Sequence, residues 1–194
     1  MDYLHTYPNA VIRYHASDMI LKITSDAAYL VQPKARSRAA VHFHLGWSNN
    51  SRTNGAVDVL CKTIKNVVTS AAEAETGGIY IGGKHACSIR NALAELGHPE
   101  PSTDSPFETD NNTAQGILTS KMRQKLSKAF DMRYWWMKDR ISQGQFNLTW
   151  APGKFNLADY FTKHHPPWHH RKMRYKYLQK VCSALRPLLN RQCA

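Results

Sequence analysis

The chain lacks a long hydrophobic run and a secretion signal. No stretch of about 18 apolar residues occurs, which excludes a transmembrane helix of the usual length. The first ten residues, MDYLHTYPNA, have neither the basic start nor the apolar core of a signal peptide. We therefore expect an intracellular, cytoplasmic protein that has no membrane partner.

Cysteines and acidic residues are also scarce. The four cysteines lie far apart and form no C-x-x-C pair, so we expect reduced thiols and neither a zinc site nor a disulfide framework. The 26 Lys and Arg outnumber the 14 Asp and Glu, which gives a formal net charge of +12. This surplus suits a polyanionic partner, either nucleic acid or an acidic membrane surface. The length of 194 residues suits one domain with a substantial core.

The hydrophobic pattern predicts an α/β fold. Strands are expected at 19–30, 39–47 and 56–64, with residues 11–15 forming a hairpin with the first of them. Helical spacing follows over 70–96, and the remaining predicted elements are a strand at 105–110, helices at 111–120 and 122–144, a strand at 145–150 and a helix at 156–163. This order indicates a mixed five-stranded sheet, antiparallel in its first three strands and flanked by helices.

Two acidic residues stand where an acid is unexpected. Asp26 lies inside a strand, where its side chain packs poorly and competes for backbone hydrogen bonds. Glu75 begins the stripe that continues through Ile79, Gly82, Ala86, Ile89, Leu93 and Leu96, which is the face expected to meet the core. Glu73 points roughly 160° away at about 100° per residue and is expected at the surface. A charge at Glu75 is costly unless it is paired or bound to a metal.

Two further acids lie at the ends of elements. Asp110 ends the strand at 105–110, where it could cap the next helix, although Asn111 could cap that helix equally well. Asp159 follows Asn156 by three residues, so a local capping role is an alternative to a place in the site. Carboxylates without Cys or His ligands suit Mg²⁺, or Mn²⁺ in its place. Two such ions, about 4 Å apart, can promote phosphodiester hydrolysis.

The remaining features have simpler interpretations. Gly77, Gly78, Gly82 and Gly83 in the long helix indicate close backbone packing, with near approach to nucleic acid as the alternative. The His164–His170 segment is interpreted as a flexible, polar linker rather than a transition-metal site. Beyond it, Met173, Tyr177, Val181 and Leu185 form an i, i+4 stripe in a basic, amphipathic tail. That tail is either a solvated appendage or a further contact to nucleic acid, a partner or a membrane surface.

Four ordered blocks resemble the ribonuclease H domain of copia-type (Pseudoviridae-like) retrotransposon polyproteins. They are Ser25-Asp26-Ala27, Ser70-Ala71-Ala72-Glu73-Ala74-Glu75, Asp110-Asn111-Asn112-Thr113-Ala114 and Leu157-Ala158-Asp159-Tyr160-Phe161-Thr162-Lys163. A weaker block, Phe130-Asp131-Met132-Arg133-Tyr134, is similar to the family's I-D-I-R-Y segment. The blocks span about 140 residues in the family's order, which makes the resemblance specific.

The resemblance implies a ribonuclease H-like fold and cleavage of the RNA strand of RNA–DNA hybrids with two Mg²⁺ ions. It assigns Asp26, Glu75, Asp110 and Asp159 as the metal ligands and catalytic acids. Residues 1–18 then correspond to the end of the segment that follows reverse transcriptase, 19–165 to the nuclease domain and 166–194 to the basic tail. The expected partners are the hybrid and a reverse transcriptase in the same polyprotein, within a retroelement particle. As an isolated domain the chain is expected to be monomeric.

Candidate contacts to the hybrid are amides and basic side chains. Asn111, Asn112 and Gln115 suit the 2′-hydroxyls of the minor groove. Basic candidates are Lys34, Arg36 and Arg38 in the loop after the strand at 19–30, and Lys121, Arg123, Lys125 and Lys128 before Trp135-Trp136. Many ribonucleases H carry a histidine in the loop before the last aspartate, and this chain has Lys154 near that place.

Two rival functions share the predicted fold. A transposase or integrase core typically ends its acidic set with a helical Glu, whereas the order here is Asp, Glu, Asp, Asp. A catalytically weak or silent module would bind hybrids without cutting them, and the presence of all four acids argues against it. Endoribonuclease activity is therefore the prediction that the sequence favours.

Overall fold

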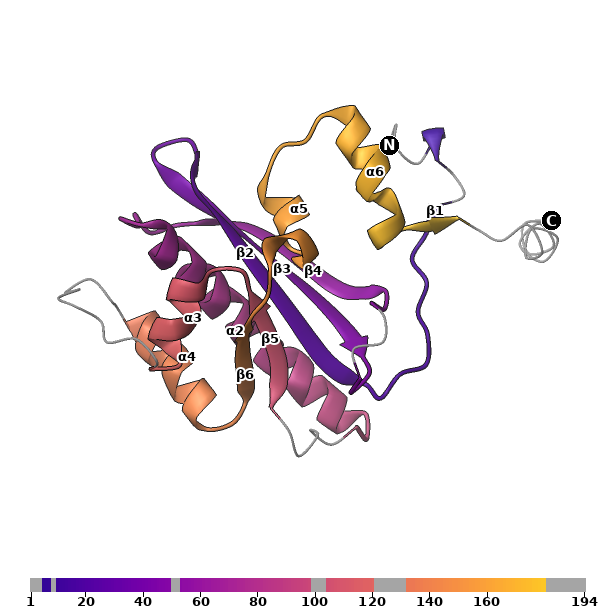
Figure 1. Cartoon of the computed structure of the whole chain (residues 1–194). Helices are drawn as coiled ribbons and strands as arrows, with labels where there is room; N and C mark the ends of the chain where they lie inside the picture. Colours follow the sequence, from indigo (N-terminus) through magenta and orange to yellow (C-terminus); the bar gives the residue numbers. More distant parts are fainter. Residues whose placement is uncertain (1–4, 8–9, 50–52, 99–103, 121–131, 181–194) are drawn as a thin grey trace.

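A five-stranded mixed sheet forms the centre of the molecule (Figure 1). The computed structural model describes residues 5–7, 10–49, 53–98, 104–120 and 132–180. The strands are β2 (Ile20–Gln32), β3 (Arg36–Gly46), β4 (Ala56–Ile64), β5 (Ser105–Thr109) and β6 (Phe146–Trp150). Their order is β4-β3-β2-β5-β6, with β2, β3 and β4 antiparallel, β5 parallel to β2, and β6 parallel to β5. The predicted fold class is confirmed.

The long helix α2 (Ala71–Glu95) covers one face of the sheet. Ser70 caps its start by accepting a hydrogen bond from the backbone N–H of Glu73. A Cβ atom at Gly82 would lie 3.0 Å from both Phe107 and Val41 across the interface. The glycines therefore allow close packing against the sheet, as the sequence indicated. The core-facing stripe ends earlier than predicted, because Leu96 lies beyond the last helical turn and is 74% exposed.

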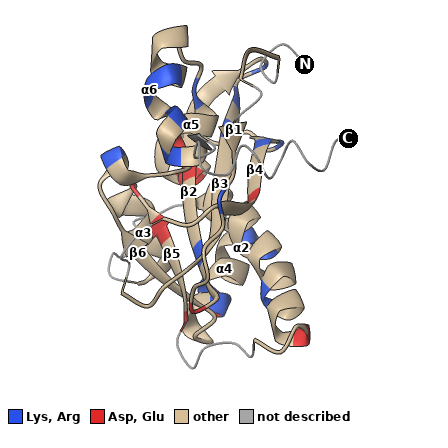
Figure 2. Cartoon of the chain, turned by 90° about the vertical axis from the view of Figure 1, so that its right-hand side faces the viewer, with Lys and Arg blue, Asp and Glu red and all other residues tan. Residues whose placement is uncertain are grey.

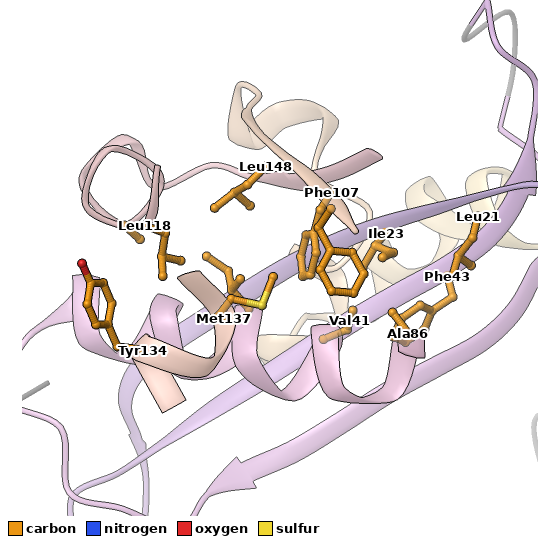
Figure 3. Packing of buried hydrophobic residues seen from close by; sticks show 13 residues of the cluster. Leu21, Ile23, Val41, Phe43, Ala86, Phe107, Leu118, Tyr134, Met137 and Leu148 are labelled. Atoms are coloured by element: carbon orange, nitrogen blue, oxygen red, sulfur yellow. The ribbon is translucent and has the colours of Figure 1, made fainter. Parts of the chain in front are cut away.

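Helices α3 (Asn112–Leu118) and α4 (Met132–Ser142) pack against α2 and close the hydrophobic core (Figure 3). Phe107 of β5 and Phe146 of β6 meet edge to face, with ring centroids 6.0 Å apart. Met137 of α4 is fully buried in the same cluster. The predicted helix at 122–144 is confirmed over 132–142, and residues 121–131, with the four basic candidates there, lie outside the described residues.

The opposite face of the sheet is covered by the later part of the chain. The short helix α5 (Asp159–Thr162) contacts β2 and β3, and α6 (Pro167–Tyr177) follows it. A 3-10 turn, η1 (Gly153–Phe155), leads from β6 toward α5. The hydroxyl of Tyr177 donates a 2.8 Å hydrogen bond to the carbonyl oxygen of Leu157, which ties α6 to the segment before α5.

The interpretation of residues 164–170 as a flexible linker is wrong. Pro167 begins α6, where its fixed φ and missing N–H suit the first helical position. The rings of His165 and His169 stack with centroids 4.2 Å apart, and His165 also stacks on Tyr160 at 5.1 Å. Aromatic packing thus orders the segment. The i, i+4 stripe holds only through Tyr177, where α6 ends, and Val181 and Leu185 lie outside the described residues.

The predicted hairpin between residues 11–15 and the first long strand is also wrong. β2 pairs with β3 on one edge and, over Ile23–Ser25, with β5 on the other, and residues 11–15 pair with neither edge. Instead β1 (Ala10–Val11) pairs antiparallel with β7 (Gln179–Lys180). The N-terminal segment and the basic tail, predicted as separate parts flanking the nuclease domain, therefore pair with one another. No helix among the described residues is long and apolar enough to span a membrane.

Candidate metal centre

Two of the predicted acids lie side by side where β2 and β5 part. Ser25 of β2 pairs with Thr109, the last residue of β5, so the residues that follow them, Asp26 and Asp110, are brought together at that point. Asp26 is buried and lies mid-strand, because β2 continues well beyond the end of β5. Asn111, not Asp110, caps α3: its side chain accepts a hydrogen bond from the N–H of Ala114. Asp110 is therefore not used as the helix cap and is available to the site, which is one of the two interpretations that the sequence allowed.

Glu75 reaches the same place from α2. Its Oε1 accepts a 3.1 Å hydrogen bond from the N–H of Ala27, a backbone group of β2 that lies past the end of β5. Glu73 points elsewhere and accepts hydrogen bonds from the N–H and hydroxyl of Thr69. The helical phase that distinguished the two glutamates is confirmed. The other oxygen of Glu75, Oε2, is buried and has no hydrogen-bond partner in the described structure.

The three carboxylates form a group that could hold a metal ion. One oxygen from each of Asp26, Glu75 and Asp110 lies within 4.8 Å of the other two. Burial, reinforced by the neighbouring acids, raises the pKa of Glu75 to about 9 and that of Asp26 to about 6. Burial also raises the pKa of Asp110 above its ordinary value. The group is therefore short of positive charge, which a divalent cation would supply.

The space beside Asp110 is kept open by a glycine. A Cβ atom at Gly153, the first residue of η1, would lie 2.8 Å from Oδ2 of Asp110. Trp150, the last residue of β6, donates from its Nε1 to the carbonyl oxygen of Asp110 at 2.9 Å. The unpartnered Oε2 of Glu75, the open space at Gly153 and the all-oxygen donor set together fit a hard divalent cation such as Mg²⁺ or Mn²⁺.

The fourth predicted ligand, Asp159, stands apart from this group of three. It is the first residue of α5, and its Oδ1 accepts a hydrogen bond from Nζ of Lys163 one turn later. The helix has no side-chain cap, so the capping role considered for Asp159 is not observed. Its charge still acts on the site, because it contributes to the raised pKa of Asp26 and of Asp110. Its role as a metal ligand remains a prediction.

Three residues near the acids were not predicted from the sequence. Thr162 is buried, and its hydroxyl donates to Oδ2 of Asp26. Asn156 is also buried and donates from Nδ2 to the carbonyl oxygen of Ser25 at 2.9 Å. Burial lowers the pKa of Lys163, but its hydrogen bond to Asp159 and the nearby acids raise it more. Thr162 and Lys163 lie within the L-A-D-x-x-T-K block, which was the available signal for both.

The predicted amide contacts differ in accessibility. Asn112 is exposed at the start of α3 and lines a groove of about 470 Å³ between α3 and β6. Gln115 lines the same groove but is only 7% exposed, and its Nε2 donates to the carbonyl oxygen of Leu148. Asn111 has its side-chain oxygen engaged in the helix cap. Asn112 is therefore the amide most open to a ligand.

The predicted basic contacts lie in the β2–β3 hairpin and in η1. Lys34 is exposed in the β2–β3 turn with a φ of 59°, and Arg36 and Arg38 lie half-buried in the first residues of β3. Figure 1 shows this hairpin reaching beyond the rest of the sheet. Lys154 is exposed in η1, next to Gly153, with its Nζ 4.7 Å from the ring centroid of Phe155. These positions are open to a phosphate backbone, and their role stays a prediction.

The fold is that of ribonucleases H. A ribonuclease H1 isolated from compost by a metagenomic approach superimposes with a TM-score of 0.55 and 10% identity, over 74% of this chain and 92% of that one. The same enzyme in complex with an RNA/DNA hybrid superimposes with a TM-score of 0.50 and 12% identity, over 73% and 92%. The N-terminal ribonuclease H domain of rv2228c from Mycobacterium tuberculosis matches with a TM-score of 0.48 and 14% identity, over 76% and 91%. No family model and no curated protein matches the sequence.

The chain therefore has the ribonuclease H-like fold, with a buried acidic group at the carboxyl end of β5 where it lies beside β2. At these identities the similarity shows the fold alone, so the activity must be argued from the site.

Proposed function

We propose that this protein is a ribonuclease H, an endoribonuclease that hydrolyses the RNA strand of RNA–DNA hybrids with the help of Mg²⁺. The observation that carries the proposal is the group Asp26, Glu75 and Asp110, buried on a fold whose solved relatives include a ribonuclease H1 bound to an RNA/DNA hybrid. A buried acidic group with an unpartnered oxygen lowers the stability of the fold, so a purely structural role does not explain it. A cation that binds the group would compensate for that cost.

Asp26, Glu75 and Asp110 would hold the metal, with Asp159 as the fourth ligand of a two-ion site. The ions would supply a Lewis acid for the phosphoryl group and an activated water as the nucleophile, with Mn²⁺ able to replace Mg²⁺. Glu75 is fixed by the N–H of Ala27, and Asp26 by the hydroxyl of Thr162, so both carboxylates are oriented before substrate arrives.

The remaining residues of the site would bind and orient the hybrid. Asn112, which is exposed and lines the groove between α3 and β6, would contact the minor groove, where 2′-hydroxyls distinguish RNA from DNA. Lys154 is exposed beside the acids, near the place where many ribonucleases H carry a histidine, and would contact a phosphate. Lys163 donates a hydrogen bond to Asp159, and an incoming cation would compete with its ammonium group for that carboxylate.

The resemblance in sequence supports a proposal about the origin of the chain. We propose that it is the ribonuclease H domain of a copia-type retrotransposon polyprotein, linked to a reverse transcriptase and acting during reverse transcription in a cytoplasmic particle. The four ordered sequence blocks support this origin. We further propose that the isolated domain is monomeric.

A cleavage assay tests the function. RNA labelled at one end and annealed to DNA is incubated with the full chain in Mg²⁺, in Mn²⁺ or in chelator, and Asp110→Asn is the inactive control. We expect internal cuts in the RNA strand that depend on metal and are absent in the variant. Hybrid binding without cleavage in either metal would point to a silent binding module, and cleavage of duplex DNA would point to a transposase-type nuclease.

A further inference from the structure

A second concave site lies on the face of the sheet away from α2. It is a cavity of about 630 Å³ between α6 and the strands β3 and β4, within the usual range for small-ligand sites of about 300–1,000 Å³. His42 and Val59 form part of its floor, and Tyr160 and Phe161 of α5 form a wall. Tyr160 directly follows Asp159 in the sequence, so the cavity begins next to the fourth predicted ligand.

The walls of the cavity are aromatic and suit a planar ligand. The rings of Tyr160 and Tyr177 lie 5.1 Å apart with an interplanar angle of 28°. Phe161 meets Tyr177 at 5.2 Å and 69°. Aromatic side chains of this kind bind nucleobases by stacking, largely independently of the base, because every base has a π face.

The charge of the lining is wholly positive. Arg171, Arg174 and Lys176 of α6 line the cavity, and none of its lining residues is Asp or Glu. Figure 2 shows the Lys and Arg of α6 in blue, above the acidic residues near α5. Arg174 lies over the ring of Tyr7, 3.8 Å from its centroid. Arg171 and Lys176 form no ion pair with another described residue, so an anionic ligand would complement them.

One polar group in the floor lacks a partner. His42 is 2% exposed, and its Nδ1 makes no hydrogen bond in the described structure. Burial, followed by the nearby His44, lowers the pKa of His42 to about 3, so the ring is neutral at physiological pH. A ligand with hydrogen-bonding edges would compensate for an unpartnered ring nitrogen, whereas a purely apolar ligand would not.

We propose that this cavity binds a nucleotide, with the base against Phe161 and Tyr177 and the phosphate at Arg171 and Lys176. The proposal concerns a site separate from the acidic group and does not depend on the cleavage activity. The nucleotide could be free in solution, or it could be an unpaired residue at the end of a nucleic-acid strand. Both sources present the same chemistry, a planar base joined to an anionic phosphate.

Equilibrium binding of adenosine 5′-monophosphate to the full chain tests the proposal. The titration is made in chelator, so that no metal ion carries the phosphate to the acidic group. Adenosine and inorganic phosphate are titrated in parallel. We expect the nucleotide to bind at least about tenfold more tightly than either part alone, because both halves of the site are then used. Absence of nucleotide binding, or phosphate binding as tight as nucleotide binding, overturns the proposal.

Two matched variants locate the binding. Arg171 and Lys172 are neighbours on α6 and are both exposed, but only Arg171 lines the cavity. We expect Arg171→Gln to weaken nucleotide binding about tenfold and Lys172→Gln to leave it nearly unchanged. Val59→Phe fills the cavity from β4 and should abolish binding, with circular dichroism as the check on folding. Equal effects of the two α6 variants would mean diffuse charge attraction and would overturn the assignment.

Two hybrids distinguish the sources of the nucleotide. One is blunt and the other carries a short unpaired overhang, and both are bound to the full chain in chelator. Tighter binding of the overhang hybrid, lost in Arg171→Gln, supports an unpaired strand end as the occupant. Equal binding of both hybrids, together with nucleotide binding that Arg171→Gln weakens, supports a free nucleotide. Neither result depends on cleavage, so the nucleotide-binding proposal and the nuclease proposal can be refuted independently of each other.

Discussion

The two faces of β2 are both buried, and they are buried in opposite ways. Toward α2, Ile23 and its neighbours pack into a dry apolar core in which glycines let the helix approach closely (Figure 3). Toward α5, Asp26 lies among polar groups, and the same face of β3 carries His42 and His44, each with an unpartnered Nδ1. Neighbouring residues of one strand point to opposite faces, so the two environments are only one residue apart. The apolar face holds the fold together, and the unsatisfied polar face is where ligands are expected.

The largest expected effect is a loss of cleavage activity when an acid of the polar site is changed. Glu75→Gln removes a charge from the acidic group and should lower hybrid cleavage at least ~10³-fold, because metal-held charge stabilisation is worth several kcal/mol and about 1.4 kcal/mol is tenfold. Glu73→Gln is the matched control two residues away and should change the rate less than about threefold. Single-turnover cleavage rates in Mg²⁺ give the comparison. A reversed ranking would show that Glu73 serves the metal.

A change on the apolar face should lower stability and leave cleavage activity nearly unchanged. Ile79 of α2 is fully buried against the sheet, so Ile79→Ala should lower the free energy of unfolding by about 2–5 kcal/mol. The acidic group is left unchanged, so the cleavage rate of the folded fraction should stay near that of the wild type at low temperature. Urea unfolding and cleavage assays on the same preparation measure both. A large loss of cleavage without loss of stability would contradict the division between the faces.

A smaller effect concerns pH in the absence of metal. The pKa of Glu75 is raised from 4.5 to about 9, so the folded chain binds more protons than the unfolded chain between these values. The stability contributed by protonated Glu75 is full below pH 4.5 and is lost as the pH rises through about 9. The free energy of unfolding in chelator should fall by up to ~1.4 kcal/mol per pH unit in this window.

Two controls assign that pH effect to the acidic group. Glu75→Gln should flatten the fall, because the amide does not titrate. Saturating Mg²⁺ should also flatten it, because the cation favours the ionised carboxylate. An equally steep fall in Glu75→Gln would assign the titration to another group, with Asp26, whose pKa is raised to about 6, as the next candidate.

The groove beside the acids gives a weaker effect. Asn112→Ala should lower hybrid cleavage about fivefold, the value of one typical hydrogen bond, while leaving metal binding intact. Asn91→Ala, an exposed amide on α2, is the control and should have no effect. Unchanged kinetics of Asn112→Ala on hybrids would remove this residue from the site.

The smallest expected effect lies in the tail. Phosphate contacts release counterions, with a log–log salt slope of about −0.9 per phosphate on B-DNA. Removing residues 181–194 deletes Arg186 and Arg191 and should flatten the slope for hybrid binding by at most about two. This truncation leaves α6 and β7 in place. Removing the chain from residue 168 onward would also remove α6, whose Tyr177 packs against Tyr160 and His42. An unchanged slope means that residues 181–194 do not contact the hybrid.

Local patterns predicted most of the fold. The β4 strand was predicted at its observed bounds, and α2 to within a residue of its ends, because strand alternation and helical periodicity persist over many residues there. The position of Glu75 on the buried face of α2 followed from the same periodicity. The pairing of β1 with β7 could not be predicted, because two two-residue strands carry almost no pattern and lie far apart in the sequence.

The sequence by itself determined the five strands of the main sheet, their order along the chain and the phase of α2, and it nominated the acids. Only the tertiary structure decided how those acids meet. The β5 strand ends beside Ser25, so the N–H of Ala27 donates to Glu75 and the carbonyl oxygen of Ser25 accepts a hydrogen bond from Asn156. It also decided that α6 covers His42 to form the cavity, whereas the hydrogen bond from Lys163 to Asp159 is local to one helical turn. Periodicity fixes which way a side chain points from its own element, whereas the distance between two elements depends on where every other strand and helix packs.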